Sequence, residues 1–207
     1  MVDSYKTISQ TVRAELKEKG SRFIARAFPV NSIEGAEEII ARISKKYFNA
    51  THNCYAYVIG CYTKAVSRFN DNGEPSGTAG KPILQAIITR DLTNVLVIVT
   101  RYFGGTRLGT GGLIRAYGGV AAQVLDQANV VTLFHTKELA LKYPYPLSNV
   151  VAKAVETFQA EISSSNYGTD VEQKVIIRKS LVHDFCDYLI NQSSDQITID
   201  FVKDLQD

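Results

Sequence analysis

Residues 101–119, RYFGGTRLGTGGLIRAYGG, follow directly on NVLVIVT (94–100), the most apolar run in the chain. They hold seven of the 14 glycines and three arginines. The apolar run predicts a buried strand, and the apolar spacing over residues 113–128 predicts a helix. The segment between them is therefore a glycine-rich, basic loop that leads from a buried strand into a helix.

A strand, a glycine-rich loop and a helix in this order present successive backbone N–H groups to a ligand, beside the positive end of the helix dipole. Glycine permits left-handed backbone and close approach of a ligand, which we expect above all of Gly111. Arginine supplies planar donors for phosphate, and aromatic rings stack on bases. The pattern predicts a phosphate or nucleic-acid site formed by Arg101, Tyr102, Phe103, Gly104, Gly105, Arg107, Gly109, Gly111, Gly112 and Arg115, together with Lys81.

A structural interpretation of the same residues stays open. The glycines also suit tight turns and close packing, Tyr102 and Phe103 can belong to the core, and Arg115 can pair with an acid. The known phosphate-binding motifs do not match. GTAGKP lacks the upstream glycine and the hydroxyl residue of a P-loop, and Ile114 stands where a dinucleotide fingerprint has glycine.

The segment FNDNGEPSGTAGKP (69–82) predicts a second long loop, of a length that is more often functional than a plain connection. Asp71 and Glu74 could hold a metal or act as acid and base, but carboxylates also form turns, which is the interpretation we favour. His52 is the only histidine near them, and these three residues are the weak catalytic candidates. We expect this loop and the glycine-rich loop to line one surface groove.

The three histidines and three cysteines are scattered, so they predict neither a zinc site nor a disulfide framework. We therefore expect buried free thiols, no metal and no cofactor. The N-terminus lacks the basic-then-apolar pattern of a signal peptide, and no apolar run approaches the roughly 20 residues that span a bilayer. The sequence thus predicts a cytoplasmic protein that does not associate with membranes.

The two halves of the chain differ in charge and in pattern. Residues 1–135 carry 16 Lys/Arg against 10 Asp/Glu, a net charge of +6, whereas residues 136–207 carry 7 against 11, a net charge of −4. In the first half we expect strands on either side of Gly20, a helix over 32–48, a strand over 53–63, a short helix over 83–89 and a final strand over 130–135. The second half predicts the order βαββαβ, a ferredoxin-like unit. The fold class is therefore α+β, with one domain over residues 1–135 and another over 136–207.

Four segments, in this order, closely resemble the YigZ/IMPACT family: KGSRFIA (19–25), HNCYAY (52–57), NDNGEPSGTAGKPIL (70–84) and VTRYFGGTRLGTGGLIRAYG (99–118). The last two motifs are highly specific. The tail resembles the additional C-terminal domain of the bacterial YigZ-type members. Asn70 stands where related chains often carry another acid, and Thr106 and Arg107 replace Ile-Lys, so the cation of the loop is kept.

The resemblance implies an N-terminal domain like the second domain of a small-subunit ribosomal protein and a C-terminal domain similar to domain V of elongation factor G. It also implies a link to translation, because the eukaryotic IMPACT relatives regulate it through a protein partner. Our leading hypothesis is a non-enzymatic, translation-associated protein whose N-terminal domain binds RNA or the ribosome and whose C-terminal domain contacts protein. Two alternatives stay open: an enzyme acting on a phosphorylated small molecule, and a regulator that binds only protein.

Overall fold

The computed structural model describes residues 3–61 and 65–204 and forms two compact units, one of Tyr5–Leu133 and one of residues 134–204 with residues 3 and 4. The assignment of separate domains to residues 1–135 and 136–207 stays a prediction. The first unit and its borders contain β1 (Ser4–Ile8), β2 (Val12–Glu18), β3 (Ser21–Pro29), α1 (Ile33–Lys46), β4 (His52–Ile59), β5 (Val66–Asn70), α2 (Gly80–Ile88), β6 (Val95–Tyr102), α3 (Gly109–Asp126) and β7 (Val130–Phe134).

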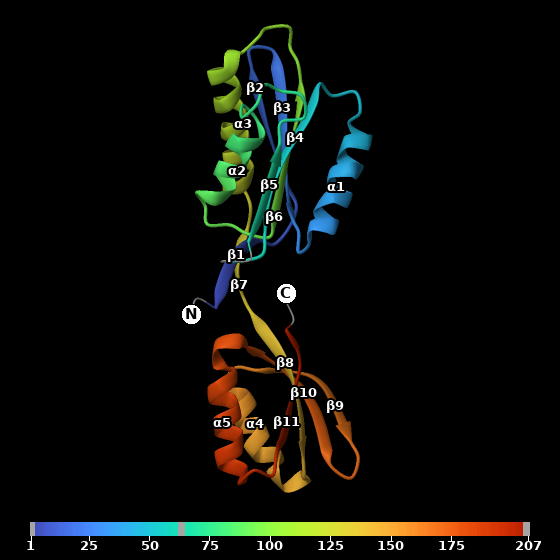
Figure 1. Ribbon diagram of the computed structural model, residues 1–207, viewed down its shortest axis with the longest axis vertical. Helices are drawn as coiled ribbons and strands as arrows, with labels where there is room; N and C mark the ends of the chain where they lie inside the picture. Colours follow the sequence, from blue (N-terminus) through green and yellow to red (C-terminus); the bar gives the residue numbers. More distant parts are fainter. Residues whose placement is uncertain (1–2, 62–64, 205–207) are drawn as a thin grey trace. The chain divides into compact units, whose positions relative to one another are not determined.

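The first unit is built on a five-stranded antiparallel sheet in the order β2-β3-β6-β4-β5. Helix α1 covers one face of the sheet, and α2 and α3 cover the other (Figure 1). Alternate residues of the central strand β6 therefore enter two different cores. Val95, Val97 and Val99 pack with α2 and α3, and Leu96 and Ile98 pack with α1. This double coverage explains why residues 94–100 are apolar without alternation.

Helix α1 has the local signals that its sequence indicates. The Ser32 hydroxyl accepts a hydrogen bond from the Gly35 N–H at 3.1 Å and so caps the first turn. Glu34 lies in the first turn, and Lys45 and Lys46 lie in the last, which complements the helix dipole. The cationic end of α1 therefore lies next to the turn that enters β4.

Three elements differ from the sequence prediction. Strand β5 takes residues 69 and 70 from the predicted loop, which shortens that loop to 71–79; β5 is an exposed edge strand and so has no alternating pattern of burial. Strand β1, which pairs with β7, was not predicted either. Helix α3 begins at Gly109, four residues early, although glycine is a poor helix former. Residues 62 and 63 of the strand predicted over 53–63 lie outside the described residues.

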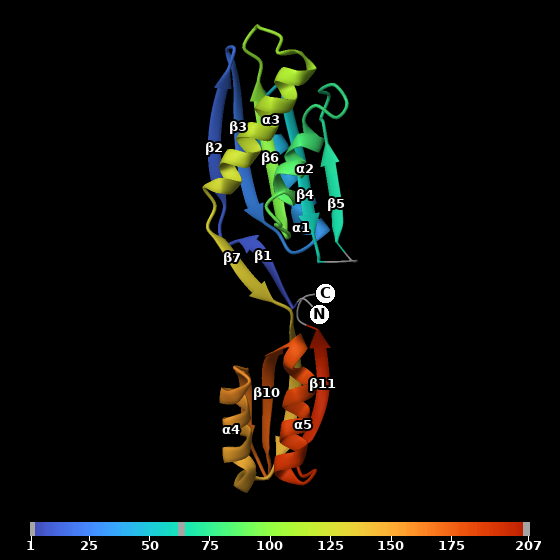
Figure 2. The same cartoon turned by 90° about the vertical axis from the view of Figure 1, so that its left-hand side faces the viewer.

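Strand register brings several chain segments to one end of the five-stranded sheet. Arg22 pairs with Tyr102, His52 pairs with Arg101, and Tyr55 pairs with Asn70. The starts of β3 and β4 and the ends of β5 and β6 therefore meet at the same end. The 71–79 loop and the glycine-rich loop both leave the sheet there, as Figure 2 shows.

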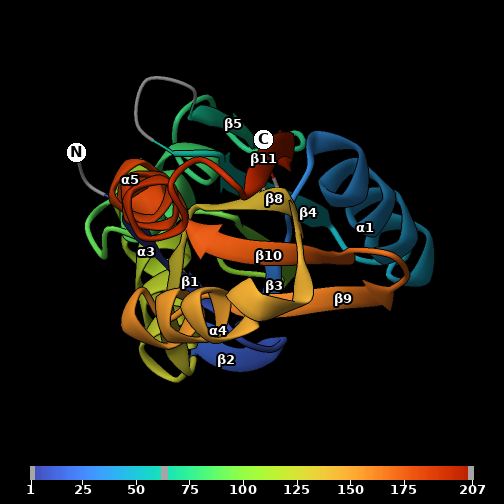
Figure 3. The same cartoon turned by 90° about the horizontal axis from the view of Figure 1, so that it is seen from below.

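The second unit contains β8 (Thr136–Tyr143), α4 (Ser148–Thr157), β9 (Glu161–Tyr167), β10 (Val171–Arg178), α5 (Val182–Ser193) and β11 (Thr198–Asp204). Its sheet is antiparallel in the order β11-β8-β10-β9. Helices α4 and α5 lie on one face of it (Figures 1 and 3) and bury Leu139, Leu141 and Val175 beneath Phe185 and Leu189. The predicted α+β class and the βαββαβ order of the second half are confirmed.

Candidate functional site

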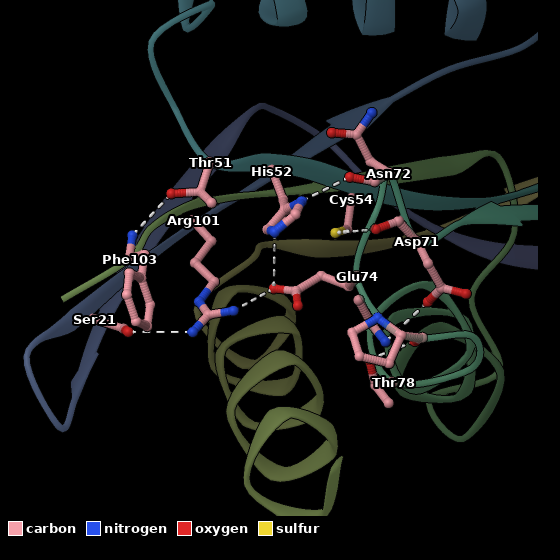
Figure 4. A network of polar contacts seen from close by, with 12 residues as sticks. Ser21, Thr51, His52, Cys54, Asp71, Asn72, Glu74, Thr78, Arg101 and Phe103 are labelled. Atoms are coloured by element: carbon pink, nitrogen blue, oxygen red, sulfur yellow. Dashed lines mark hydrogen bonds and ion pairs between the residues drawn. The ribbon is translucent and has the colours of Figure 1, made fainter. Parts of the chain in front are cut away.

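The 71–79 loop is joined to the start of the glycine-rich segment through one buried carboxylate. Glu74 Oε1 accepts hydrogen bonds from Arg101 Nη1 at 2.5 Å and from the Tyr117 hydroxyl at 2.7 Å. The Glu74 and Arg101 side chains are only 3% and 6% exposed. These contacts join the loop, strand β6 and helix α3, which come from three separate stretches of sequence (Figure 4). A buried charge is tolerated only when it is paired in this way.

His52 extends the same cluster toward the surface. Its Nδ1 lies 2.7 Å from the Asn72 carbonyl oxygen, a contact in which Nδ1 carries the proton and donates. Its Nε2 then faces Glu74 Oε1 at 3.8 Å. The structure thus brings together two of the three weak catalytic candidates. Because Arg101 and Tyr117 already occupy Oε1, the arrangement favours a structural role for Glu74 over that of a free base.

Asp71, the third candidate, has its carboxylate directed at backbone. One oxygen accepts from the N–H groups of Ala79 and Gly80 at 3.0 and 2.8 Å, and the other accepts from Gly77 N–H at 2.8 Å. Helix α2 has no side-chain cap of its own, so Asp71 satisfies N–H groups at its start. These contacts hold the loop in shape. Asp71 therefore acts as a turn former here, which is the alternative to a metal ligand or an acid–base group.

Cys54 lies beneath this cluster and is fully buried. Its Sγ is 3.0 Å from the Asp71 carbonyl oxygen and 3.4 Å from the Tyr117 hydroxyl. Burial raises the pKa of the Cys54 thiol from 9.0 to about 12, because a thiolate there would lose its hydration; burial also raises the pKa of Tyr117. Both groups are therefore neutral polar members of the core.

Alkaline solution is expected to destabilise the protein partly through Cys54. The folded-state pKa lies above the unfolded one, so the contribution of the neutral thiol is complete below about pH 9 and is lost as the pH rises through about 12. Cys54→Ser removes a group that ionises in this window. Urea unfolding at several pH values should show a shallower alkaline loss for Cys54→Ser than for the wild type. Burial also raises the pKa of the half-buried Cys186 thiol, so Cys186→Ser should show a smaller change in the same direction. An equally steep loss in Cys54→Ser would contradict the assignment.

The structure places Arg101 differently from the exposed loop cation that its sequence position suggests. Besides Glu74, its guanidinium contacts Ser21 Oγ at 3.3 Å and lies between the rings of Phe23 and Phe103, 5.3 and 5.5 Å from their centroids. Arg101 is thus a buried cation that positions the Phe103 ring. The reason is the strand register, which directs residue 101 to the α3 side of the sheet, where Glu74 lies.

The other residues assigned to the phosphate site lie mainly at the surface. Tyr102 and Gly112 are half-buried, and exposed positions are taken by Phe103, Gly104, Gly105, Arg107, Gly109, Gly111, Arg115 and Lys81. Gly105 and Gly109 have φ of +88° and +69°, a backbone region that favours glycine. Helix α3 has no side-chain cap and no acid in its first turn. The loop therefore offers backbone N–H groups and cations on an open surface.

A groove of about 540 Å³ lies between α2 and α3, and its rim includes Lys81 and Arg90. Gly77 of the 71–79 loop reaches it, but α3 contributes Ile114, Gly118 and Ala122, beyond the glycine-rich loop itself. The two loops therefore meet through Glu74 and Arg101, while the groove is lined by Gly77 of the 71–79 loop and by residues of α3 that follow the glycine-rich loop. The expectation that both loops line one groove stays a prediction.

Sequence reasoning did not identify the turn that follows α1 as part of this end of the sheet. The Tyr102 hydroxyl donates to Asn49 Oδ1 at 3.3 Å, and the Phe103 N–H donates to Thr51 Oγ1 at 2.9 Å. Phe48, in the same turn, has 84% of its surface exposed. The sequence predicts a helix over 32–48 that includes Phe48, whereas the observed helix ends at Lys46, so no local signal marked this turn.

Across residues 3–61 and 65–204, no three His, Cys, Asp or Glu side chains are grouped so that they could hold a metal ion. None of the helices in those ranges is both long and apolar enough to cross a bilayer.

Known proteins are similar to this chain over most of its length. A family model described as the Impact N-terminal domain matches residues 19–125. The chain is 35% identical to IMPACT family member YvyE of Bacillus subtilis (strain 168) over 91% of this chain and 87% of that protein, and 32% identical to IMPACT family member YigZ of Escherichia coli (strain K12) over 84% and 85%. A crystal structure of a hypothetical protein superposes with a TM-score of 0.69 at 28% identity, covering 98% of this chain and 99% of that one. The chain therefore belongs to the IMPACT family, which confirms the resemblance seen in its motifs.

Proposed function

We propose that this protein is a non-enzymatic, translation-associated protein whose first unit binds the phosphates of RNA, including ribosomal RNA. Membership of the IMPACT family supports a role related to the regulation of translation. RNA and ribosomes lie in the cytoplasm, which is where the proposal places the protein.

One observation carries the proposal: the surface around the glycine-rich loop is cationic, and its cations form no ion pair with an acidic side chain among the described residues. Arg107, Arg115 and Lys81 are exposed, and within the described residues none of the three has an ion-pair partner. Arg107 and Arg115 belong to the segment that holds the exposed glycines and the uncapped start of α3, and Lys81 lines the groove beside Ile114 of α3. Such N–H groups and cations suit phosphate oxygens. By contrast, the buried carboxylate of Glu74 is held by Arg101 and Tyr117, which argues against the enzyme alternative.

The second unit is proposed to contact protein. Its half of the chain carries a net charge of −4, which disfavours RNA phosphate as its ligand. The outer strand β9 is exposed at every residue and so offers an edge to a partner. A regulator that binds only protein would use this unit and would leave the cations of the first unit unused.

Arg107→Ala is expected to reduce the salt dependence of RNA binding by about one phosphate contact. Each neutralised phosphate releases a counterion, so the slope of log affinity against log salt is about −0.7 per contact on single strands. Arg107, Arg115 and Lys81 acting together predict a slope of roughly −2 for the wild type. The measurement is a salt titration of labelled RNA with the full chain.

Arg42→Ala is the matched control, because Arg42 is an exposed arginine on α1, which covers the opposite face of the sheet from α3. It should leave the slope unchanged. Equal slopes for Arg107→Ala and the wild type would show that Arg107 does not contact an RNA phosphate. If the wild type does not bind RNA at low salt, the proposed function is wrong, and the enzyme and protein-binding alternatives gain support.

A further inference from the structure

Part of the sheet of the first unit carries four cations on the side where α1 packs. Strand register pairs Arg13 with Arg26 and Lys17 with Arg22, and residues four apart in a strand share a face, so these side chains of β2 and β3 lie on one face. This is the α1 side of the sheet, because Arg26 pairs with Ile98 of the core beneath that helix. We call Arg13, Lys17, Arg22 and Arg26 the basic sheet face.

Helix α1 leaves the basic sheet face open. The core beneath α1 takes residues from β4, from β6 and from the end of β3, and it contains none of the described residues of β2. In Figure 2, α1 lies behind β4 and β5, whereas β2 and the start of β3 lie toward the opposite edge of the sheet. Arg13, Lys17 and Arg22 are accordingly exposed. A large ligand can therefore reach this face.

Arg26 adds a buried positive charge to the basic sheet face. It is 8% exposed, its Nη1 donates to Thr100 Oγ1 at 3.2 Å, and its guanidinium carbon lies 4.1 Å from the centre of the Tyr47 ring. Among the described residues, no carboxylate contacts it. Buried cations are normally paired with an acid. The uncompensated charge of Arg26 therefore favours an anion on the exposed surface beside it.

Glu15 lies on the same face and holds two of the exposed cations next to each other. It accepts from Arg13 Nη2 at 2.8 Å, and from Arg22 Nε and Nη2 at 2.6 and 2.9 Å. A guanidinium group has five N–H donors, so each arginine keeps donors for a further oxyanion. Glu15 thus orders the two arginines but neutralises only one charge of the basic sheet face.

The basic sheet face adjoins the glycine-rich loop through the turn between β2 and β3. A Cβ on Gly20 of this turn would lie only 2.8 Å from the Gly104 carbonyl oxygen, and the Gly104 N–H donates to Ser21 Oγ at 3.2 Å. Figures 1 and 2 both show the turn and the loop side by side. Lys19 is exposed in the turn, and Arg107 is exposed in the loop. Cations therefore continue from the loop across the end of the sheet onto its α1 side.

We infer that the basic sheet face binds phosphates of the same RNA strand as the glycine-rich loop, so that the strand crosses the turn between β2 and β3. This inference rests on the proposed function. Two guanidinium groups held side by side, with a lysine next to them, suit successive phosphates of one backbone. The same charges attract acidic protein segments, but the contact with the glycine-rich loop favours RNA, because one strand can bind both.

The salt dependence of the wild type is the first test, with a labelled oligouridine of about 12 nucleotides, within the usual range of site sizes. Adding Arg13, Lys17 and Arg22 to the three cations of the proposed function predicts a slope of roughly −4 instead of roughly −2. Lys17→Ala with Arg22→Ala removes two neighbouring exposed cations and should make the slope shallower by about 1.4.

Arg42→Ala with Arg68→Ala is the matched control. It removes the same charge from exposed arginines of α1 and of β5, the edge strand farthest from β2, and should leave the slope unchanged. Removing Arg68 deprives Glu37 of its partner, just as removing Arg22 does for Glu15. Lys17→Arg with Arg22→Lys keeps both charges and should bind with the wild-type slope, which separates the effect of charge from any change in the hairpin.

The outcomes separate this inference from the function on which it rests. A wild-type slope near −2, or a double alanine variant of Lys17 and Arg22 that keeps the wild-type slope, would overturn the role of the basic sheet face and leave phosphate binding by the glycine-rich loop intact. Polyglutamate that binds the wild type but not this variant, while RNA binds both equally, would assign the face to an acidic protein segment instead. An absence of RNA binding by the wild type at low salt would overturn both proposals.

Discussion

Glu74→Ala is expected to lower the free energy of unfolding by about 3–5 kcal/mol, the usual result of removing one partner from a buried ion pair. The substitution would leave the Arg101 guanidinium buried without its carboxylate and the Tyr117 hydroxyl without its acceptor. Both groups would then carry an uncompensated desolvation cost. Urea unfolding followed by circular dichroism gives this free energy directly.

Glu37→Ala is the matched control for this experiment. Glu37 also accepts from an arginine, Arg68 Nη1 at 3.0 Å, but this pair is 42% and 56% exposed. Solvent screening limits such a pair to less than about 1 kcal/mol. If Glu74→Ala and Glu37→Ala lower stability equally, the buried cluster does not hold the two loops together. The double variant Glu74→Leu with Arg101→Met should recover much of the loss, because it removes both charges from the core.

Gly104→Ala is expected to lower the free energy of unfolding by about 3 kcal/mol and to displace the glycine-rich loop. A Cβ at this position would lie 1.8 Å from the Gly20 carbonyl carbon, 2.0 Å from its oxygen and 2.3 Å from the Ser21 nitrogen. These are backbone atoms, so they cannot turn aside as a flexible side chain would. Gly20 itself has φ of +80°, which fixes the tight turn between β2 and β3. Overpacking of this kind typically costs about 1–3 kcal/mol, and more where backbone must move.

Gly119→Ala is the control, because it is expected to change the free energy of unfolding in the opposite direction. Gly119 lies within α3, where an added Cβ would meet no atom within 4 Å. Alanine there should raise the free energy of unfolding by about 0.5–1 kcal/mol, because it restricts the unfolded chain and favours helix. Thermal unfolding of both variants measures the contrast. A neutral Gly104→Ala would contradict the close approach of the two turns.

The glycine that is most crowded in the structure is not the one that the sequence indicates. The sequence favoured Gly111 as the sensitive position, but in α3 it has helical backbone, and its nearest atom to an added Cβ is Arg115 Nη1 at 3.7 Å, an ordinary contact. Gly104 is the crowded position instead. Its constraint comes from Gly20, in a hairpin of a different part of the chain. Composition and local spacing carry no information about that approach.

The sequence by itself determined the elements whose signals are local. The apolar run before residue 101, the helical spacing of α1 and the alternating strands of the second half each predict their own structure, because burial repeats with the period of the element. The four motifs were also sufficient to indicate the family. Edge strand β5 was not predicted, because it has no buried face and its sequence therefore lacks a periodic pattern of apolar residues.

Tertiary structure alone decided which charges are buried and which distant segments contact one another. Arg101 and Arg107 belong to the same loop sequence, yet strand register directs Arg101 onto Glu74 while Arg107 stays exposed. Likewise, the Tyr102 hydroxyl reaches Asn49 only because the turn after α1 lies beside the end of β6. Pairs so distant in the chain form through the packing of whole elements, and packing depends on every residue of the sheet rather than on the segment that contains the site.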